Sequence, residues 1–117
     1  MSSTDSSDLL VAGLCAQWCG TCRDYLPLFR RQAARFDGRA RFAWVDVEDH
    51  DEVMGHLDVE NFPTLMIARG DEVLFYGTVL PHEQTLARLV ESARAGDLKP
   101  VHDAALDGLP QRVRAIE

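Results

Sequence analysis

Several features that would point to nucleic acid, membrane or a disulfide scaffold are scarce in this sequence. Basic residues are few, with 12 Lys and Arg against 19 Asp and Glu, and the formal net charge is -7. Binding to nucleic acid or to an anionic membrane needs a positive surface. The longest apolar run, LLVAGLCA at residues 9–16, is far below the roughly 20 residues of a membrane-spanning helix. We therefore expect neither nucleic acid nor membrane as a partner.

The start of the chain also lacks the features of an export signal. The first residues, MSSTDSSD, contain no Lys or Arg and no apolar segment, whereas a secretory signal begins with a basic region. Residues 9–16 resemble a lipoprotein cleavage site at Cys15 only faintly, because Leu14 stands where a small residue is needed. We expect a disordered segment at residues 1–8 and a cytoplasmic location.

Cysteine is rare, and two of the three cysteines, Cys19 and Cys22, form one Cys-x-x-Cys. Three cysteines are too few for a scaffold of several disulfides, which leaves redox chemistry, metal binding or coincidence. Zinc needs about four ligands, but there is no second cysteine pair and the four histidines are scattered. Metal binding is the weaker interpretation, and we expect no metal and no cofactor.

Apolar spacing predicts one domain with alternating elements. The strands are expected at residues 9–15, 41–47, 64–68 and 73–79, and the helices at residues 19–36, at 51–57 around a mid-helix Gly55, and after Pro81 to about residue 95. Between the last two strands, RGDE at residues 69–72 is interpreted as a hairpin turn.

This order predicts an α/β fold with a mixed central β-sheet flanked by helices, because it begins with a parallel β-α-β unit and continues with a hairpin. We assign residues 9–95 to this domain and residues 96–117 to a C-terminal extension. In the extension, Leu109, Val113 and Ile116 follow Pro110 at helical spacing. This short helix is expected to dock either on the core or on a partner.

A Cys-x-x-Cys that opens a helix directly after a buried strand is typical of thioredoxin-like proteins. WCGTC at residues 18–22 resembles the WCGPC motif of thioredoxins, and Pro27 stands where that family has its helix-kinking proline. Phe62-Pro63-Thr64 resembles the family's cis-proline loop. The resemblance covers about residues 9–95 and implies a thioredoxin-like fold with a redox-active Cys-x-x-Cys.

The sequence departs from the family at three places. The strand and helix that open a full thioredoxin are expected to be absent or replaced, because so few residues precede the first core strand. Gly13 stands where thioredoxins hold a buried aspartate, and Thr21 replaces the proline between the cysteines. Gly13 either leaves the second thiol without a nearby base or is simply a close-packing position in the strand.

Thiol-disulfide exchange needs an attacking thiolate and a second thiol that resolves the mixed disulfide. Cys19 is expected at the helix N-terminus, where unpaired N-H groups and the helix dipole stabilise a thiolate. Cys22 is expected one turn further in and more buried. We therefore assign Cys19 as the nucleophile and Cys22 as the resolving thiol.

The remaining site residues are assigned to the binding of a client chain. Trp18, Gly20 and Thr21 lie around the thiols, and Trp18 is either a flat surface for the client or a core aromatic. The resemblance implies a cis bond before Pro63, which would place the backbone of Phe62 and Pro63 beside the sulfurs; the alternative is a trans turn proline.

Three other side chains near the motif could take part in the chemistry. Cys15 lies four residues before Cys19, and it is either a small buried hydrophobic residue or a third redox thiol. Asp46 and Glu48, at the end of the second strand, could be proton-transfer carboxylates, but only their strand position suggests it, so they are interpreted as solvated or capping charges.

The leading hypothesis is a monomeric protein-disulfide reductase that acts on protein disulfides and accepts electrons from a thioredoxin reductase. One rival is a thioredoxin-fold binding or assembly module with little turnover. Another is an oxidase or isomerase in an exported compartment. A reactive thiol pair favours turnover over the binding module, and the composition of the N-terminus favours the cytoplasm.

Overall fold

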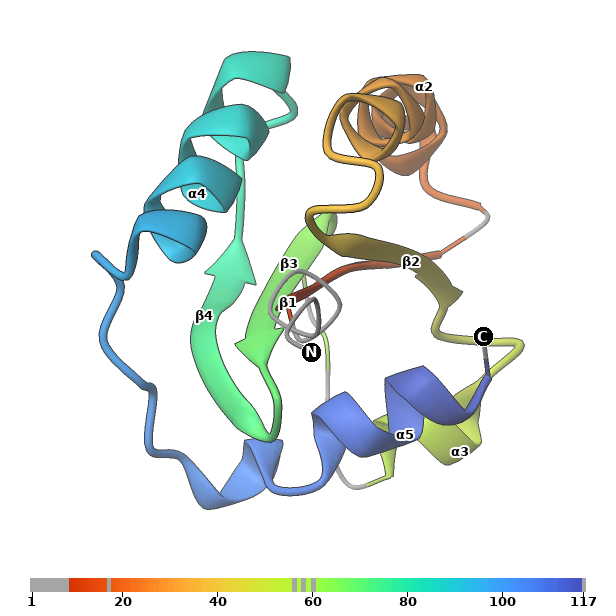
Figure 1. The fold of residues 1–117 in the computed structure, drawn as a ribbon. Helices are drawn as coiled ribbons and strands as arrows, with labels where there is room; N and C mark the ends of the chain where they lie inside the picture. Colours follow the sequence, from red (N-terminus) through yellow and green to blue (C-terminus); the bar gives the residue numbers. More distant parts are fainter. Residues whose placement is uncertain (1–8, 17, 56, 58, 60, 117) are drawn as a thin grey trace.

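The structure is a computed structural model that describes residues 9–16, 18–55, 57, 59 and 61–116. Its centre is a four-stranded sheet with the strand order β2-β1-β3-β4, and helices cover both faces (Figure 1). The strands are β1 (Leu9–Cys15), β2 (Arg41–Asp46), β3 (Thr64–Arg69) and β4 (Glu72–Thr78). The helices are α2 (Gly20–Arg35), α3 (Asp51–Met54), α4 (Glu83–Ala95), the 3-10 turn η1 (Ala104–Leu106) and α5 (Leu109–Ala115).

Strand β1 is the centre of this sheet. It pairs in parallel with β2 and antiparallel with β3, and all of its residues are buried. Successive side chains of a strand point to opposite faces. Leu10 and Leu14 accordingly pack with α3 and α5, whereas Leu9 and Val11 pack with α2 and α4. Burial on both faces explains the unbroken apolar run, and the predicted mixed sheet flanked by helices is confirmed.

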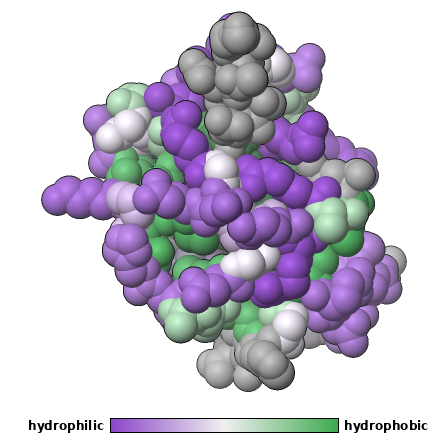
Figure 2. All heavy atoms as spheres, turned by 60° about the horizontal axis from the view of Figure 1, so that its bottom comes forward, coloured by the Kyte–Doolittle hydropathy of each residue, from purple (hydrophilic) through white to green (hydrophobic). Residues whose placement is uncertain are grey.

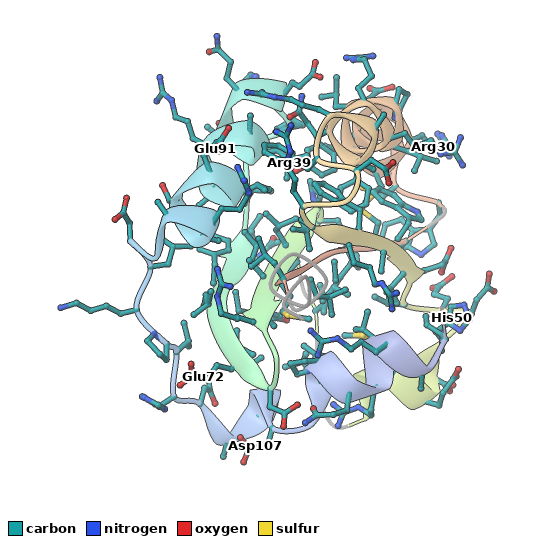
Figure 3. The ribbon with its side chains drawn as sticks, in the orientation of Figure 1. Arg30, Arg39, His50, Glu72, Glu91 and Asp107 are labelled. Atoms are coloured by element: carbon teal, nitrogen blue, oxygen red, sulfur yellow. A yellow bond between two sulfur atoms is a disulfide. The ribbon has the colours of Figure 1, made fainter. Side chains whose placement is uncertain are left out.

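Helices α2 and α4 lie side by side on one face of the sheet (Figure 1). Aromatic residues of α2, including Tyr25 and Phe29, share one apolar cluster with Leu86 and Val90 of α4. Polar contacts join the outer edges of the two helices. Glu83 accepts hydrogen bonds from Arg31 and Gln32, and Glu91, on the side of α4 that faces α2 (Figure 3), pairs with Arg35 at 3.5 Å.

The opposite face is covered by α3 and by the C-terminal helix α5. Leu109 and Val113 are fully buried in one cluster with Val53 and Met54. Two arginines of α5 bind backbone carbonyls of other elements: Arg112 Nε donates to Val53 O at 2.5 Å and Arg114 Nη1 to Gly70 O at 2.6 Å. From this side the surface is largely hydrophilic, with smaller apolar areas between the polar residues (Figure 2). Helix α5 therefore docks on the core, which is one of the two places expected for it.

The sequence-based boundaries need few changes. Helix α3 is shorter than predicted because Gly55, at φ 58°, is its C-cap and not a mid-helix residue. The 69–72 segment forms the expected hairpin turn, with Gly70 at φ 59°. The predicted disordered segment at residues 1–8, and any element that replaces the family's opening strand and helix there, lie outside the described residues.

Gly13 is a close-packing position in β1. A Cβ atom added to it would lie 3.0 Å from Cε3 of Trp44 and 3.3 Å from Cε1 of Phe29. Trp44 is the β2 residue paired with Gly13 in the sheet. The two rings occupy the space that an aspartate side chain would need, so the structure favours close packing over the absence of a base as the reason for this glycine.

We expect Gly13→Ala to lower the free energy of unfolding by about 1–3 kcal/mol, the usual cost of overpacking a core. In a Trp44→Ala background this cost should fall by about half, because the nearest obstacle is gone. Urea unfolding of the two single variants and the double variant measures this coupling. Gly20→Ala is the matched control, since a Cβ there has no neighbour closer than 3.8 Å. If Gly13→Ala lowered the free energy of unfolding equally in the natural protein and in Trp44→Ala, the packing argument would be contradicted.

We expect Leu109→Ala in α5 to destabilise the protein by about 2–5 kcal/mol, the range for truncating a buried leucine. Gln111→Ala, at an exposed position of the same helix, should stay within about 0.5 kcal/mol of the natural protein. Urea unfolding gives both values. The alkylation rate of Cys19 in folded Leu109→Ala should be unchanged, because α5 packs on the face of the sheet opposite to α2; a changed rate would mean that α5 acts on the thiols.

Candidate active site

The candidate site lies where the end of β1 meets the start of α2. Cys15 is the last residue of β1, Cys19 is the N-cap of α2, and Cys22 is the third residue of the helix. The backbone N-H of Cys19 donates to Ala16 O at 3.0 Å, which fixes the turn between strand and helix. Cys19 is partly exposed, whereas Cys22 is only 2% exposed. The predicted difference in solvent exposure between Cys19 and Cys22 is confirmed.

A disulfide joins Cys15 to Cys22, with the two Cα atoms 5.8 Å apart, and Cys19 is a free thiol. Strand alternation explains the pairing: Cys15 is on the same face of β1 as Gly13, which packs against Phe29 of α2. Cys22 lies on the buried side of α2 together with Tyr25 and Phe29. Cys15 is thus both buried, as one interpretation expects, and bonded to another cysteine.

Trp18 is 63% exposed, so the alternative of a core aromatic is wrong. Its ring meets Phe62 edge to face, with centroids 5.6 Å apart, and its Nε1 donates to Glu48 Oε2 at 2.9 Å. Asp46 in turn accepts a 2.9 Å hydrogen bond from the backbone N-H of Glu48. Asp46 is therefore a capping charge, as interpreted, whereas Glu48 has the additional task of orienting Trp18.

The predicted cis bond between Phe62 and Pro63 is confirmed. The carbonyl of Pro63 accepts a 3.1 Å hydrogen bond from the backbone N-H of Val79, just after β4. The next residue, Leu80, is 66% exposed. Sequence reasoning missed Leu80; the available signal was a lone leucine between the end of a strand and Pro81.

Gly20 and Thr21 are exposed at the first two positions of α2, next to Cys19. The structure thus brings the predicted client-binding residues Trp18, Gly20 and Thr21 together at one helix end, and Phe62 joins them through its contact with Trp18. Pro63 itself is buried.

The described residues around Cys22 offer little for proton transfer. Gly13 has no side chain, and burial raises the pKa of Tyr25, one turn further along α2, to about 12. The Tyr25 hydroxyl is therefore neutral near pH 7. The group beside Cys22 is the sulfur of Cys15, to which it is bonded.

Within the described residues, no group of three His, Cys, Asp or Glu side chains could hold a metal ion. Among the same residues, no helix is long and apolar enough to cross a membrane.

Comparison with known proteins gives the same picture at the level of sequence. The family model described as Thioredoxin matches residues 2–92. Thioredoxin H2-1 of rice is 40% identical over 68 residues, which are 58% of this chain and 49% of that protein. The protein disulfide-isomerase A6 homolog of Caenorhabditis elegans is 34% identical over 68 residues, 58% of this chain and 16% of that protein. The matches thus span half or less of these relatives.

A longer match exists to putative thioredoxin 2 of Streptomyces coelicolor, which is 29% identical over 104 residues, 89% of this chain and 76% of that protein. Among solved structures, the thioredoxin Deadhead of Drosophila melanogaster superposes with a TM-score of 0.66 at 22% identity and covers 77% of this chain and 84% of its own. A mutant thioredoxin from Halobacterium salinarum gives a TM-score of 0.64 at 28% identity, covering 77% and 78%.

These similarities confirm the expected α/β thioredoxin-like fold. The helix α5 lies beyond the matched residues 2–92, so it is a feature of this chain that the family model does not describe. The family model covers most of the chain, including all three cysteines, the cis-proline and the four strands. The chain belongs to the thioredoxin family.

Proposed function

We propose that this protein is a thiol-disulfide oxidoreductase that reduces disulfides in client proteins. One observation carries the proposal: a partly exposed free thiol, Cys19, caps a helix one turn ahead of a buried cysteine, Cys22, beside the exposed Trp18. A surface thiol attacks a client disulfide, and a thiol close behind it releases the client. The exposed Trp18, in contact with the half-buried Phe62, and the exposed Leu80 supply apolar surface on which an extended client segment can lie.

The reaction takes place in two exchanges. In the first, the Cys19 thiolate attacks one sulfur of the client disulfide, and the other client sulfur leaves as a thiolate. In the second, Cys22 attacks Cys19 Sγ in the mixed disulfide and releases the second client thiolate. Two electrons have then passed from the protein to the client, and the client carries two thiols.

The direction of transfer and the partners are part of the proposal. We assign net reduction in the cytoplasm, by a monomer, with a thioredoxin reductase as electron donor, because a reducing pool keeps such thiols reduced. Three relatives carry names of the protein disulfide-isomerase type, so isomerisation is the second candidate. It is favoured by the free Cys19, since isomerisation begins with the attack of one thiolate on a client disulfide. A binding module with little turnover is the remaining alternative.

Insulin reduction with dithiothreitol, and then with a thioredoxin reductase as donor, tests the proposal. We expect turnover with the natural protein and none above background with Cys19→Ser, because no other thiol is exposed among the described residues. Cys22→Ser should retain the first exchange and accumulate a mixed disulfide with insulin, visible on a non-reducing gel. Absence of turnover with both donors would favour the binding module, and refolding of scrambled ribonuclease without insulin turnover would favour the isomerase.

We expect Glu48→Ala to raise the KM for insulin by about threefold, with kcat little changed, because Trp18 loses the hydrogen bond that orients it for the client. The rate with a small aromatic disulfide, which does not need the client surface, should stay within about 1.5-fold. Glu52→Ala is the matched control, since Glu52 is an exposed carboxylate bound to His50 and not to Trp18. A similar KM change in both variants would show a general charge effect instead.

A further inference from the structure

We propose that Cys15 is a third redox residue, which takes over the disulfide from Cys19 and Cys22 by internal exchange and so frees Cys19 again. This inference rests on the proposed function, because the Cys19–Cys22 bond that it consumes is the product of client reduction. Its product is the disulfide that the structure contains, between Cys15 and Cys22.

The geometry makes Cys22 the common partner of the two other cysteines. Cys19, the N-cap, and Cys22 are three residues apart at the same end of α2, a spacing that places two side chains on one side of a helix. Cys22 also faces the sheet, where Cys15 ends β1 and is bonded to it. The Cys22 sulfur can therefore bond to the surface thiol on one side or to the strand thiol on the other.

The internal exchange balances without any outside reagent. The Cys15 thiolate attacks Cys22 Sγ in the Cys19–Cys22 bond; the Cys15–Cys22 bond forms, the Cys19–Cys22 bond breaks, and Cys19 leaves as a thiolate. The number of disulfides and of electrons in the protein is the same before and after. The proton of Cys15 passes to solvent or to Cys19.

Burial favours this direction. Cys15 and Cys22 are only 1% and 2% exposed, whereas Cys19 is partly exposed. In the exchange the negative charge moves from the buried Cys15 to Cys19 at the surface, which lowers its desolvation cost. The new bond is also withdrawn from external thiols, since exchange requires access to the sulfur that is attacked.

The relay gives the oxidised protein a property that a two-cysteine site lacks. After one client has been reduced, Cys19 is again a free surface thiol and can attack a second disulfide, while Cys22 is occupied and cannot release that client. Re-reduction must begin with attack on the buried bond, by Cys19 from inside or by a reductant that reaches it. The oxidised form is thus expected to retain a client as a mixed disulfide until electrons arrive.

The location of the free thiol in the oxidised natural protein tests the relay. The protein is oxidised with diamide, which needs no client, and then unfolded in N-ethylmaleimide at mildly acidic pH, where exchange is slow. After reduction the other two cysteines are alkylated with iodoacetamide. Trypsin releases all three cysteines in residues 1–23, because Arg23 is the first basic residue, and fragmentation of this peptide shows which cysteine carries the maleimide.

We expect the maleimide on Cys19 at about tenfold excess over Cys15, because the internal exchange leaves the free thiol at the partly exposed Cys19 and not at the buried Cys15. Maleimide on Cys15, which means a Cys19–Cys22 bond, would overturn the relay. Oxidised Cys15→Ala should carry no maleimide and should be reduced by dithiothreitol about tenfold faster than the natural protein, because its bond includes the surface sulfur. An equal rate would also contradict the relay.

Failure of the relay and failure of the proposed function give different results. If Cys15→Ala reduces insulin but the maleimide of the natural protein lies on Cys15, only the relay is wrong. If no variant reduces insulin, the proposed function is wrong wherever the label lies. Cys15→Val, which fills the buried position, replaces Cys15→Ala if that variant does not fold, and the label in the natural protein decides in either case.

Discussion

The packing of α2 on the end of β1 is the contact on which the rest of the site depends. It lets a buried strand end directly beneath a helix N-terminus, so that Cys19 lies at the surface while Cys15 and Cys22 are enclosed. Gly13 makes this approach possible, because the rings of Phe29 and Trp44 occupy the space beside its Cα. Close packing of the helix on the strand therefore depends on the absence of a side chain at Gly13.

Most of the fold could be predicted from the sequence because its signals are local. The apolar run of β1, the alternation in β2 and the turn at Gly70 each follow from periodicity or backbone preference over a few residues. The end of α3 was misjudged at Gly55 because the same residue can weaken a helix from within or end it with a positive φ, and only tertiary contacts decide.

The site was predictable in part, for a similar reason. The Cys-x-x-Cys is a local motif, so the relative exposure of Cys19 and Cys22 followed from it. The partnership of Cys15 with Cys22 depends on which face of β1 meets which side of α2. Strand alternation and helical spacing together indicate that Cys15 and Cys22 face each other. The Cys-x-x-Cys motif, however, favoured a pair between Cys19 and Cys22. The link from Glu48 to Trp18 joins residues 30 positions apart and has no local signal.

The third sulfur also bears on how a site without a buried aspartate can operate. Resolution of a mixed disulfide needs Cys22 as a thiolate, and neither Gly13 nor the neutral Tyr25 can remove its proton near pH 7. Trp44 and Phe29 close the space beside Gly13 to a carboxylate side chain. The thiol of Cys15, two residues further along the same face of β1, can be enclosed without a lasting charge, because it is neutral before the exchange and bonded after it. Close packing around Gly13 and a redox role for Cys15 are thus compatible in one core, where a permanently charged base would be costly to bury.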